Sequence, residues 1–184
     1  MRTDRIIEAF DVELRFTQFP LHPDTPSEGR ALTDLFAGRG VDLDAYQARV
    51  VQIAAEEGLP YGLRTHTYNS RLAQELAKWG EKQPGGEGIH DVLFRAYFVE
   101  GINLADIDRL VEIAGSVGLS EEEARDVVER RTHRARVDED WERSAQLGVT
   151  SVPTFVFGNR GVVGAQPYEA LEELVVRGGG QRRT

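Results

Sequence analysis

The sequence contains no cysteine and a single methionine among its 184 residues. A chain without cysteine has no thiol nucleophile, no thiolate ligand for zinc and no redox disulfide of its own. A chain of this length can bury about 70% of its unfolded surface, so it needs neither disulfides nor metals for stability. The composition therefore excludes thiol chemistry by these residues alone.

Long hydrophobic runs are also lacking, because no apolar stretch approaches the roughly 18 residues that a membrane-spanning helix needs. Near the start of the sequence, Ile6 and Ile7 are adjacent apolar residues, but they do not form the core of a signal peptide. We therefore expect a cytoplasmic protein without a membrane partner.

Basic residues are scarce: 22 Lys and Arg stand against 31 Asp and Glu, which gives a formal net charge of −9. Such a chain repels a phosphate backbone on average, so we expect no nucleic-acid partner. The densest cationic cluster, Arg125 to Arg136, is interleaved with carboxylates. This mixture favours a solvated helix face with i,i+4 ion pairs over an anion-binding site.

Residues for other common chemistries are present, but not in the required patterns. The four histidines, His22, His66, His90 and His133, have no metal-ligand spacing. The glycines from Gly85 to Gly88 do not follow a strand, and Ser151 lacks the setting of a nucleophile elbow. We predict no metal site and no catalytic residue within the chain.

The two ends of the sequence have the pattern of an α/β layer. Alternating apolar residues predict a strand over Val12–Phe19 with one buried face. Thr154–Phe157 and Val162–Val163 flank turn residues and predict a hairpin, and Pro167 opens a final helix. The tail from Arg177 to Thr184 is expected to fray.

The middle of the sequence is almost purely helical. Asp42 is a predicted N-cap for a helix with apolar residues at Leu43, Tyr46, Val50 and Ile53. Further apolar stripes follow Asn69, and Ser120 with Glu123 forms a capping box. We therefore predict a discontinuous domain over residues 1–41 and 142–184, interrupted by a helical insertion domain over residues 42–141.

One short segment does not look ordinary. Pro153 directly precedes a predicted strand, a position that proline tolerates. With a cis peptide bond before Pro153, Val152 would turn its N–H and C=O outward, where an extended peptide could pair with them. An ordinary trans proline at a strand start is the alternative.

The run GVTSVPTFVFGNRGVVGAQPYEAL, Gly148 to Leu171, resembles the C-terminal half of a DsbA-type thioredoxin-fold domain, and within that superfamily the FrnE-like group. Phe19-Pro20-Leu21, Leu93–Phe98 and Glu100–Asn103 agree with it in order. The resemblance implies a thioredoxin-like fold with an inserted helical domain and a cis peptide before Pro153. It also implies that Thr150, Ser151, Val152 and Pro153 bind the extended backbone of a peptide or of a disulfide-bearing protein.

The departure from the family is equally informative. Members begin with a strand and a Cys-X-X-Cys at the start of the first helix, where the helix dipole lowers the thiol pKa. This sequence starts inside that helix, at about Thr3, so the strand and the dithiol have no counterpart. Without the central strand, the predicted strands Val12–Phe19 and Thr154–Phe157 keep open edges, which would permit self-association.

The resemblance leaves three functions open. The first is a protein thiol–disulfide oxidoreductase or isomerase whose dithiol is encoded upstream of Met1. The second is a glutathione-dependent isomerase or transferase of the kappa or hydroxychromene carboxylate isomerase type; under the other two readings no cofactor is expected. The third is a non-catalytic peptide-binding module. The DNA sequence upstream of Met1 would distinguish among them.

Overall fold

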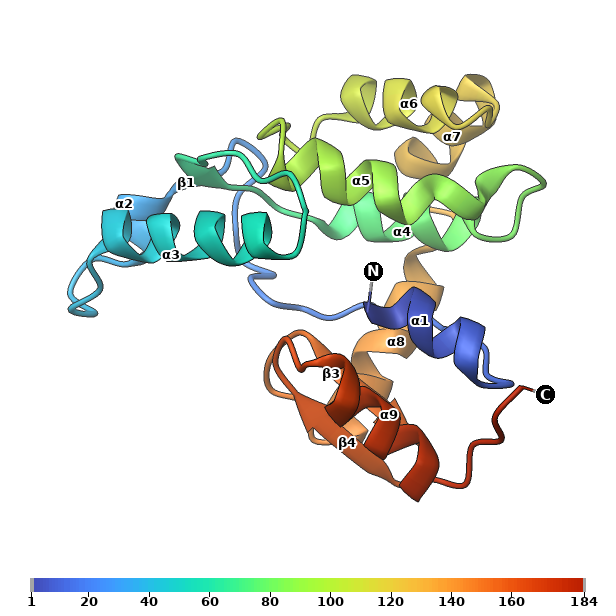
Figure 1. The fold of residues 1–184 in the computed structure, drawn as a ribbon. Coiled ribbons are helices and arrows are strands. Elements are labelled where there is room, and N and C mark those ends of the chain that lie inside the picture. The colour runs from blue at the N-terminus through green and yellow to red at the C-terminus, as the bar shows by residue number, and fades with distance from the viewer. Residues whose placement is uncertain (1, 184) are drawn as a thin grey trace. The chain divides into compact units, whose positions relative to one another are not determined.

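The computed structural model describes residues 2–183, and the chain forms two compact units. We call Met1–Leu21 with Asp140–Thr184 the split unit, and His22–Glu139 the helical unit. Figure 1 shows the course of the chain through both. The chain passes from one unit to the other after Leu21, and it returns within one helix, α8 (Arg134–Gln146).

The helical unit contains most of the helices, together with one short β-ribbon. Its elements are β1 (Arg30–Ala31), α2 (Leu32–Leu35), α3 (Leu43–Glu56), β2 (His66–Thr67), α4 (Arg71–Gly80), the 3-10 helix η1 (Gly86–Gly88), α5 (Ile89–Phe98), α6 (Ile107–Ser116), α7 (Glu121–Arg130) and the start of α8.

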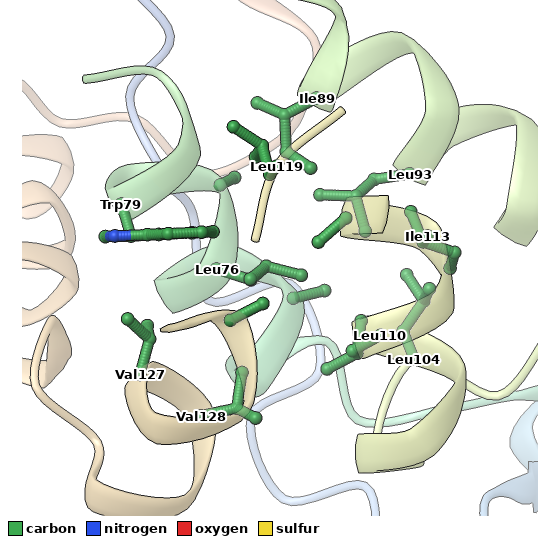
Figure 2. Close-up of a cluster of buried hydrophobic side chains, with 14 of the residues drawn as sticks. Leu76, Trp79, Ile89, Leu93, Leu104, Leu110, Ile113, Leu119, Val127 and Val128 are labelled. Carbon is green, nitrogen blue, oxygen red and sulfur yellow. The ribbon is translucent and has the colours of Figure 1, made fainter. Parts of the chain in front are cut away.

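The core of the helical unit lies among α4, α5, α6 and α7 (Figure 2). Leu76, Ile89 and Leu110 are completely buried at its centre, and Trp79 covers one end. These residues recur in the sequence at the spacing of about 3.6 residues that places side chains on one face of a helix. The apolar faces that this spacing predicts pack together as the core of the helical unit. Ser120 caps α7 as predicted, because its Oγ accepts a hydrogen bond from the Glu123 N–H at 3.2 Å.

The helical unit begins at His22, whereas the predicted insertion began at residue 42. The physical reason is a set of contacts that tie the preceding segment to it. The Asn69 side-chain amide donates to the carbonyl oxygens of Pro23 and Thr25, and β1 pairs antiparallel with β2. The unit ends at Glu139, and its ribbon means that it is not purely helical.

The split unit combines α1 (Arg2–Ala9), the end of α8, the hairpin β3 (Thr154–Phe157) and β4 (Arg160–Val163), and α9 (Tyr168–Arg177). The predicted hairpin is confirmed, with Phe155 opposite Val162. Those two side chains pack against a small core whose buried members are Ile6, Phe10, Leu171 and Val175.

The strand predicted over Val12–Phe19 is wrong. The segment is irregular, and its Gln18 N–H donates to Asp140 Oδ2 at 2.9 Å instead of to a neighbouring strand. Leu14 and Phe16 remain 40% and 37% exposed. Alternation marks a segment that can form a strand, but no strand in the described part of the chain pairs with it.

The expectation that the C-terminal tail frays is also wrong for residues 177–183, and Thr184 lies outside the described residues. The Arg183 N–H donates to the Ala9 carbonyl at 3.0 Å, and the Asp11 N–H donates to the Gln181 carbonyl at 2.8 Å. The Arg182 guanidinium lies over the Phe10 ring, 4.8 Å from its centroid. Polar and aromatic contacts therefore hold the tail over a completely buried phenylalanine.

Candidate functional site

The loop Thr150–Pro153 lies between the end of α8 and the start of β3. Gly148 ends the helix with a φ of +67°, a conformation that glycine adopts readily. The Val149 N–H then donates to the Ser144 carbonyl at 2.9 Å, which closes the helix terminus. This ending directs the chain out of the helix and into the loop.

Two hydrogen bonds fix the far end of the loop. Thr154 Oγ1 donates to the Ser151 carbonyl at 2.7 Å, and the Gly164 N–H donates to the Pro153 carbonyl at 2.7 Å. The Val152–Pro153 peptide bond is cis. The loop is therefore anchored to β3 on one side and to the residue after β4 on the other.

Val152 stands between these anchors and is 45% exposed, while Thr150 and Pro153 are also exposed and Ser151 is half-buried. Among the described residues, the N–H and C=O of Val152 make no hydrogen bond within the chain. A main-chain donor and acceptor without intramolecular partners can bind another extended backbone.

The neighbouring strand also has an open side. In the described part of the chain, β3 is hydrogen-bonded to β4 alone, so its second edge is unpaired. Val156 and Val163 lie on the hairpin face opposite the core and are 44% and 58% exposed. The edge and this apolar face adjoin the loop in sequence, and both belong to the split unit.

The surroundings of the loop carry almost no charge, since no Asp, Glu, Lys or Arg occurs from Ser144 to Asn159. Leu147, just before the loop, is 50% exposed. Binding there would depend on main-chain hydrogen bonds and apolar contacts, with little contribution from ion pairs.

The histidines do not join this region. All four lie in the helical unit, so Ser151 has no histidine partner within the split unit. His90 Nε2 lies 3.2 Å from Glu81 Oε2, and His66 Nδ1 lies 2.9 Å from Thr65 Oγ1. Among residues 2–183, no group of three or more His, Cys, Asp or Glu side chains is placed to hold a metal ion.

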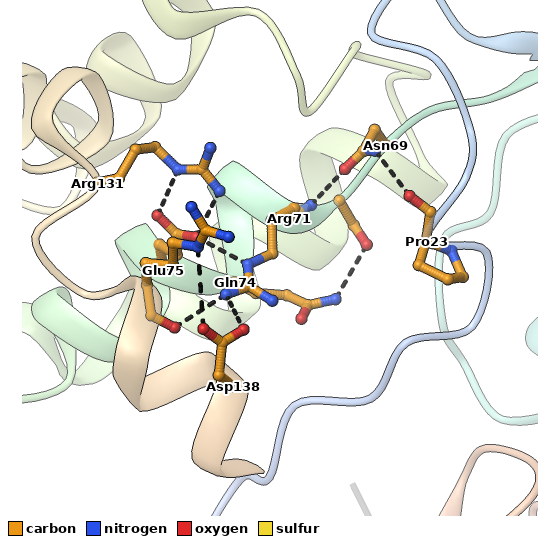
Figure 3. A network of polar contacts seen from close by, with 9 residues as sticks. Pro23, Asn69, Arg71, Gln74, Glu75, Arg131 and Asp138 are labelled. Atoms are coloured by element: carbon orange, nitrogen blue, oxygen red, sulfur yellow. Dashed lines mark hydrogen bonds and ion pairs between the residues drawn. The ribbon is translucent and has the colours of Figure 1, made fainter. Parts of the chain in front are cut away.

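The main polar cluster of the helical unit surrounds Glu75 on α4 (Figure 3). This fully buried carboxylate accepts two hydrogen bonds from Arg131 and one from Arg71, each at 2.7 Å. Burial would raise the pKa of Glu75, but the hydrogen bonds from Arg131 and Arg71 outweigh it and lower that pKa. The cluster is internally satisfied and ties α4 to the segment after α7.

The cationic cluster predicted as a solvated helix face largely behaves that way. Arg130 pairs with Asp126, and Arg136 pairs with Glu139, at exposed i,i+4 and i,i+3 positions. Arg131 is the exception, because it pairs with the buried carboxylate of Glu75, 56 residues away in the sequence. Local charge patterning gave no sign of this long-range pair.

No helix within residues 2–183 is long and apolar enough to cross a membrane.

Comparison with known proteins defines the class. The DSBA-like thioredoxin domain family matches residues 1–176, so the chain belongs to that family and has its thioredoxin-like fold. The protein YwbO of Bacillus subtilis, whose function is uncharacterised, is 25% identical over 178 residues, which is 94% of this chain and 85% of YwbO.

Two solved structures show the same fold. A 2-hydroxychromene-2-carboxylate isomerase matches with a TM-score of 0.64 and 21% identity, over 73% of this chain and 66% of the isomerase. The cytosolic disulfide reductase DsbM of Pseudomonas aeruginosa, solved with GSH, matches with a TM-score of 0.53 and 25% identity. That match covers 69% of this chain and 73% of DsbM.

Proposed function

We propose that this chain binds extended segments of substrate proteins at the loop Thr150–Pro153 and serves protein thiol–disulfide exchange as an FrnE-like member of its family. The observation that carries the proposal is the exposed Val152, whose N–H and C=O have no hydrogen-bond partner among residues 2–183. The unpaired edge of β3 follows directly in the sequence. A bound segment would add to these groups as a strand adds to a sheet edge.

The exchange step needs thiols that this chain does not contain. In thiol–disulfide exchange a thiolate attacks one sulfur of a disulfide, a new S–S bond forms, and the other sulfur leaves as a thiolate. No residue among these 184 can supply the attacking thiolate. We therefore assign substrate binding and orientation to the chain, and the attacking cysteine to a segment or partner outside it.

A peptide titration tests the binding step. The probe is a fluorescein-labelled, apolar extended peptide, and its control is the same peptide with alternate backbone amides methylated. We expect saturable anisotropy for the first and about tenfold weaker binding for the second, since methylation removes main-chain donors. Equal binding of both peptides would contradict strand-like pairing.

Two matched variants locate the site. Val152→Asp places a charge in the uncharged loop, and Val176→Asp makes the same change at a valine of α9 that is 51% exposed. We expect Val152→Asp to weaken peptide binding and Val176→Asp to leave it unchanged. The reverse result would move the site to another surface of the split unit.

An insulin-reduction assay tests the assignment of the thiol. With dithiothreitol as the reductant, we expect the 184-residue chain to leave the rate of insulin precipitation at its uncatalysed value. Acceleration by the chain alone would overturn the conclusion that the attacking cysteine comes from elsewhere.

A glutathione-dependent isomerase or transferase is the second candidate, because the 2-hydroxychromene-2-carboxylate isomerase has a TM-score of 0.64 and DsbM was solved with GSH. Glutathione is itself a peptide and would be the cofactor under this alternative. Calorimetry with glutathione distinguishes the candidates: glutathione binding without binding of the longer peptide favours the second.

The proposal also includes a cytoplasmic location, which the description of DsbM as cytosolic supports. If peptides bind but no thiol source yields exchange activity, the chain is a non-catalytic peptide-binding module. Cell fractionation with an antibody to the chain would test the location.

A further inference from the structure

Helix α3 has no buried residue, although its sequence has an apolar stripe. Leu43, Tyr46, Val50 and Ile53 follow one another at spacings of three and four residues, which is the a/d pattern of a helix that packs against another helix. Tyr46 and Ile53 are nevertheless 49% and 45% exposed. We call these four residues the α3 seam.

The contacts of α3 with other elements of the helical unit are few. The Tyr46 ring packs against Phe36, with 5.8 Å between ring centroids, and Gln47 Oε1 accepts from the Arg64 N–H at 3.1 Å. Leu43 and Val50 are half-buried, whereas Tyr46 and Ile53 are exposed. The seam is therefore only partly covered.

Exposed apolar side chains also occur beyond both ends of the helix. Val41 precedes it and is 40% exposed, while Leu59 and Leu63 follow it and are 45% and 75% exposed. Five large apolar side chains are thus exposed between residues 41 and 63. Such a concentration on one segment is typical of an interaction surface.

The charges along α3 indicate what kind of partner fits. Asp42, Asp44, Glu56 and Glu57 adjoin seam residues in the sequence, and Arg49 is the cation among them. Asp42 also accepts from the Ala45 N–H, and Glu56 accepts from the Gln52 side chain. The helical unit as a whole has 14 Lys and Arg against 22 Asp and Glu. A second copy would bring the same negative charge, whereas a cationic partner would complement it.

We infer that the α3 seam docks a cationic amphipathic helix of a partner protein. Tyr46 and Ile53 are seven residues apart, so they match apolar side chains at the same spacing on a facing helix. Lys and Arg beside those side chains would face Asp42, Glu56 and Glu57. This surface and the proposed peptide site share no residue, and they lie in different units.

A designed peptide of about 18 residues, with Leu at the a/d positions and Lys at the flanking positions, is the probe. One control peptide has the same composition in scrambled order, and another has Glu in place of Lys. We expect saturable anisotropy for the probe, and about tenfold or weaker affinity for both controls. Equal binding of the scrambled peptide would overturn the inference, because it would show charge attraction alone.

Variants of the full chain then test the location. Tyr46→Glu with Ile53→Glu should abolish probe binding, and Glu56→Lys with Glu57→Lys should weaken it while leaving the seam intact. Phe94→Glu, at a 50% exposed position of α5, is the matched control and should bind as the parent does. Far-UV circular dichroism checks that each variant is folded.

Sedimentation equilibrium of the chain alone tests the competing explanation, in which the seam binds a second copy of the chain. A monomer agrees with the inference. A dimer that Tyr46→Glu with Ile53→Glu dissociates would assign the seam to a second copy and overturn it, as would probe binding that none of these substitutions changes.

Discussion

The two units of the chain differ in the size of their apolar cores and in the kind of group that they leave exposed. The helical unit has a continuous core and a buried carboxylate with two arginine partners. The split unit has a smaller cluster of buried apolar residues, its strands β3 and β4 each keep one edge without a partner strand among residues 2–183, and valines beside its loop are exposed. The difference indicates that the helical unit is the more stable of the two, and that the split unit offers main-chain groups for binding.

The largest expected effect comes from the small core. Phe10→Ala should cost about 4 kcal/mol, because it removes a completely buried ring from a cluster with few other members. We expect amide hydrogen exchange to accelerate throughout the split unit while amides around Leu76 stay protected. Loss of protection in both units together would show that they unfold as one, and would break the comparison.

The next effect concerns the buried carboxylate of the helical unit. Glu75→Ala leaves Arg71 and Arg131 facing an empty position and should cost about 3 kcal/mol in urea unfolding. Glu112→Ala is the control, since its 2.7 Å pair with Arg109 is exposed and should contribute less than about 0.5 kcal/mol. Similar losses for both variants would mean that burial does not distinguish the pairs.

Acid should weaken the helical unit. The lowered pKa of Glu75 means that its ionised form favours the folded state; this stability is present above the unfolded pKa and is lost as pH falls through the folded one. Burial, followed by Arg39 and Arg30, lowers the pKa of His22, and burial, followed by Arg136, lowers that of His133. These two lowered histidine pKa values also make the folded state less stable as the pH falls, in the same direction as the lowered pKa of Glu75.

We therefore expect the urea midpoint of the helical unit to fall between about pH 7 and pH 4. Glu75→Gln should make the urea midpoint less dependent on pH at the acidic end. The difference in stability between this variant and the parent should therefore shrink as the pH falls. A deficit that stays constant down to pH 4 would contradict the assigned role of the ionised carboxylate.

A smaller effect than that of Glu75→Ala is expected at a helix cap. Ser120→Ala removes the hydrogen bond to the Glu123 N–H and should cost about 1 kcal/mol in the helical unit. Ser120→Asp should retain most of that stability, because a carboxylate also accepts at an N-cap. A Ser120→Ala variant as stable as the parent would show that the cap contributes nothing measurable.

Local features of the sequence predicted the core and the α7 cap of the helical unit. The periodic apolar residues around Leu76 and Leu110 form its core, and Ser120 caps its helix, because helices depend on neighbours three or four residues away. The contacts of Asn69 with Pro23 and Thr25 could not be predicted, since they join segments more than forty residues apart. Those contacts place residues 22–41 in the helical unit.

Pairing between distant segments explains the failures in the split unit. The alternation of Val12–Phe19 is genuine, but a strand also needs a partner that no local pattern reveals. The tail is held by Ala9 and Phe10, far away in sequence. The loop Thr150–Pro153 could be located from its proline and the strand after it, whereas the exposure of Val152 required the structure.

The central claim is that the loop Thr150–Pro153 binds an extended backbone, and a two-dimensional amide NMR titration with the apolar peptide tests it most directly. We expect shifts concentrated at the amides of Thr150, Ser151, Val152 and β3, with the α3 amides unmoved. Shifts confined to the helical unit, or none at saturating peptide, would contradict the claim.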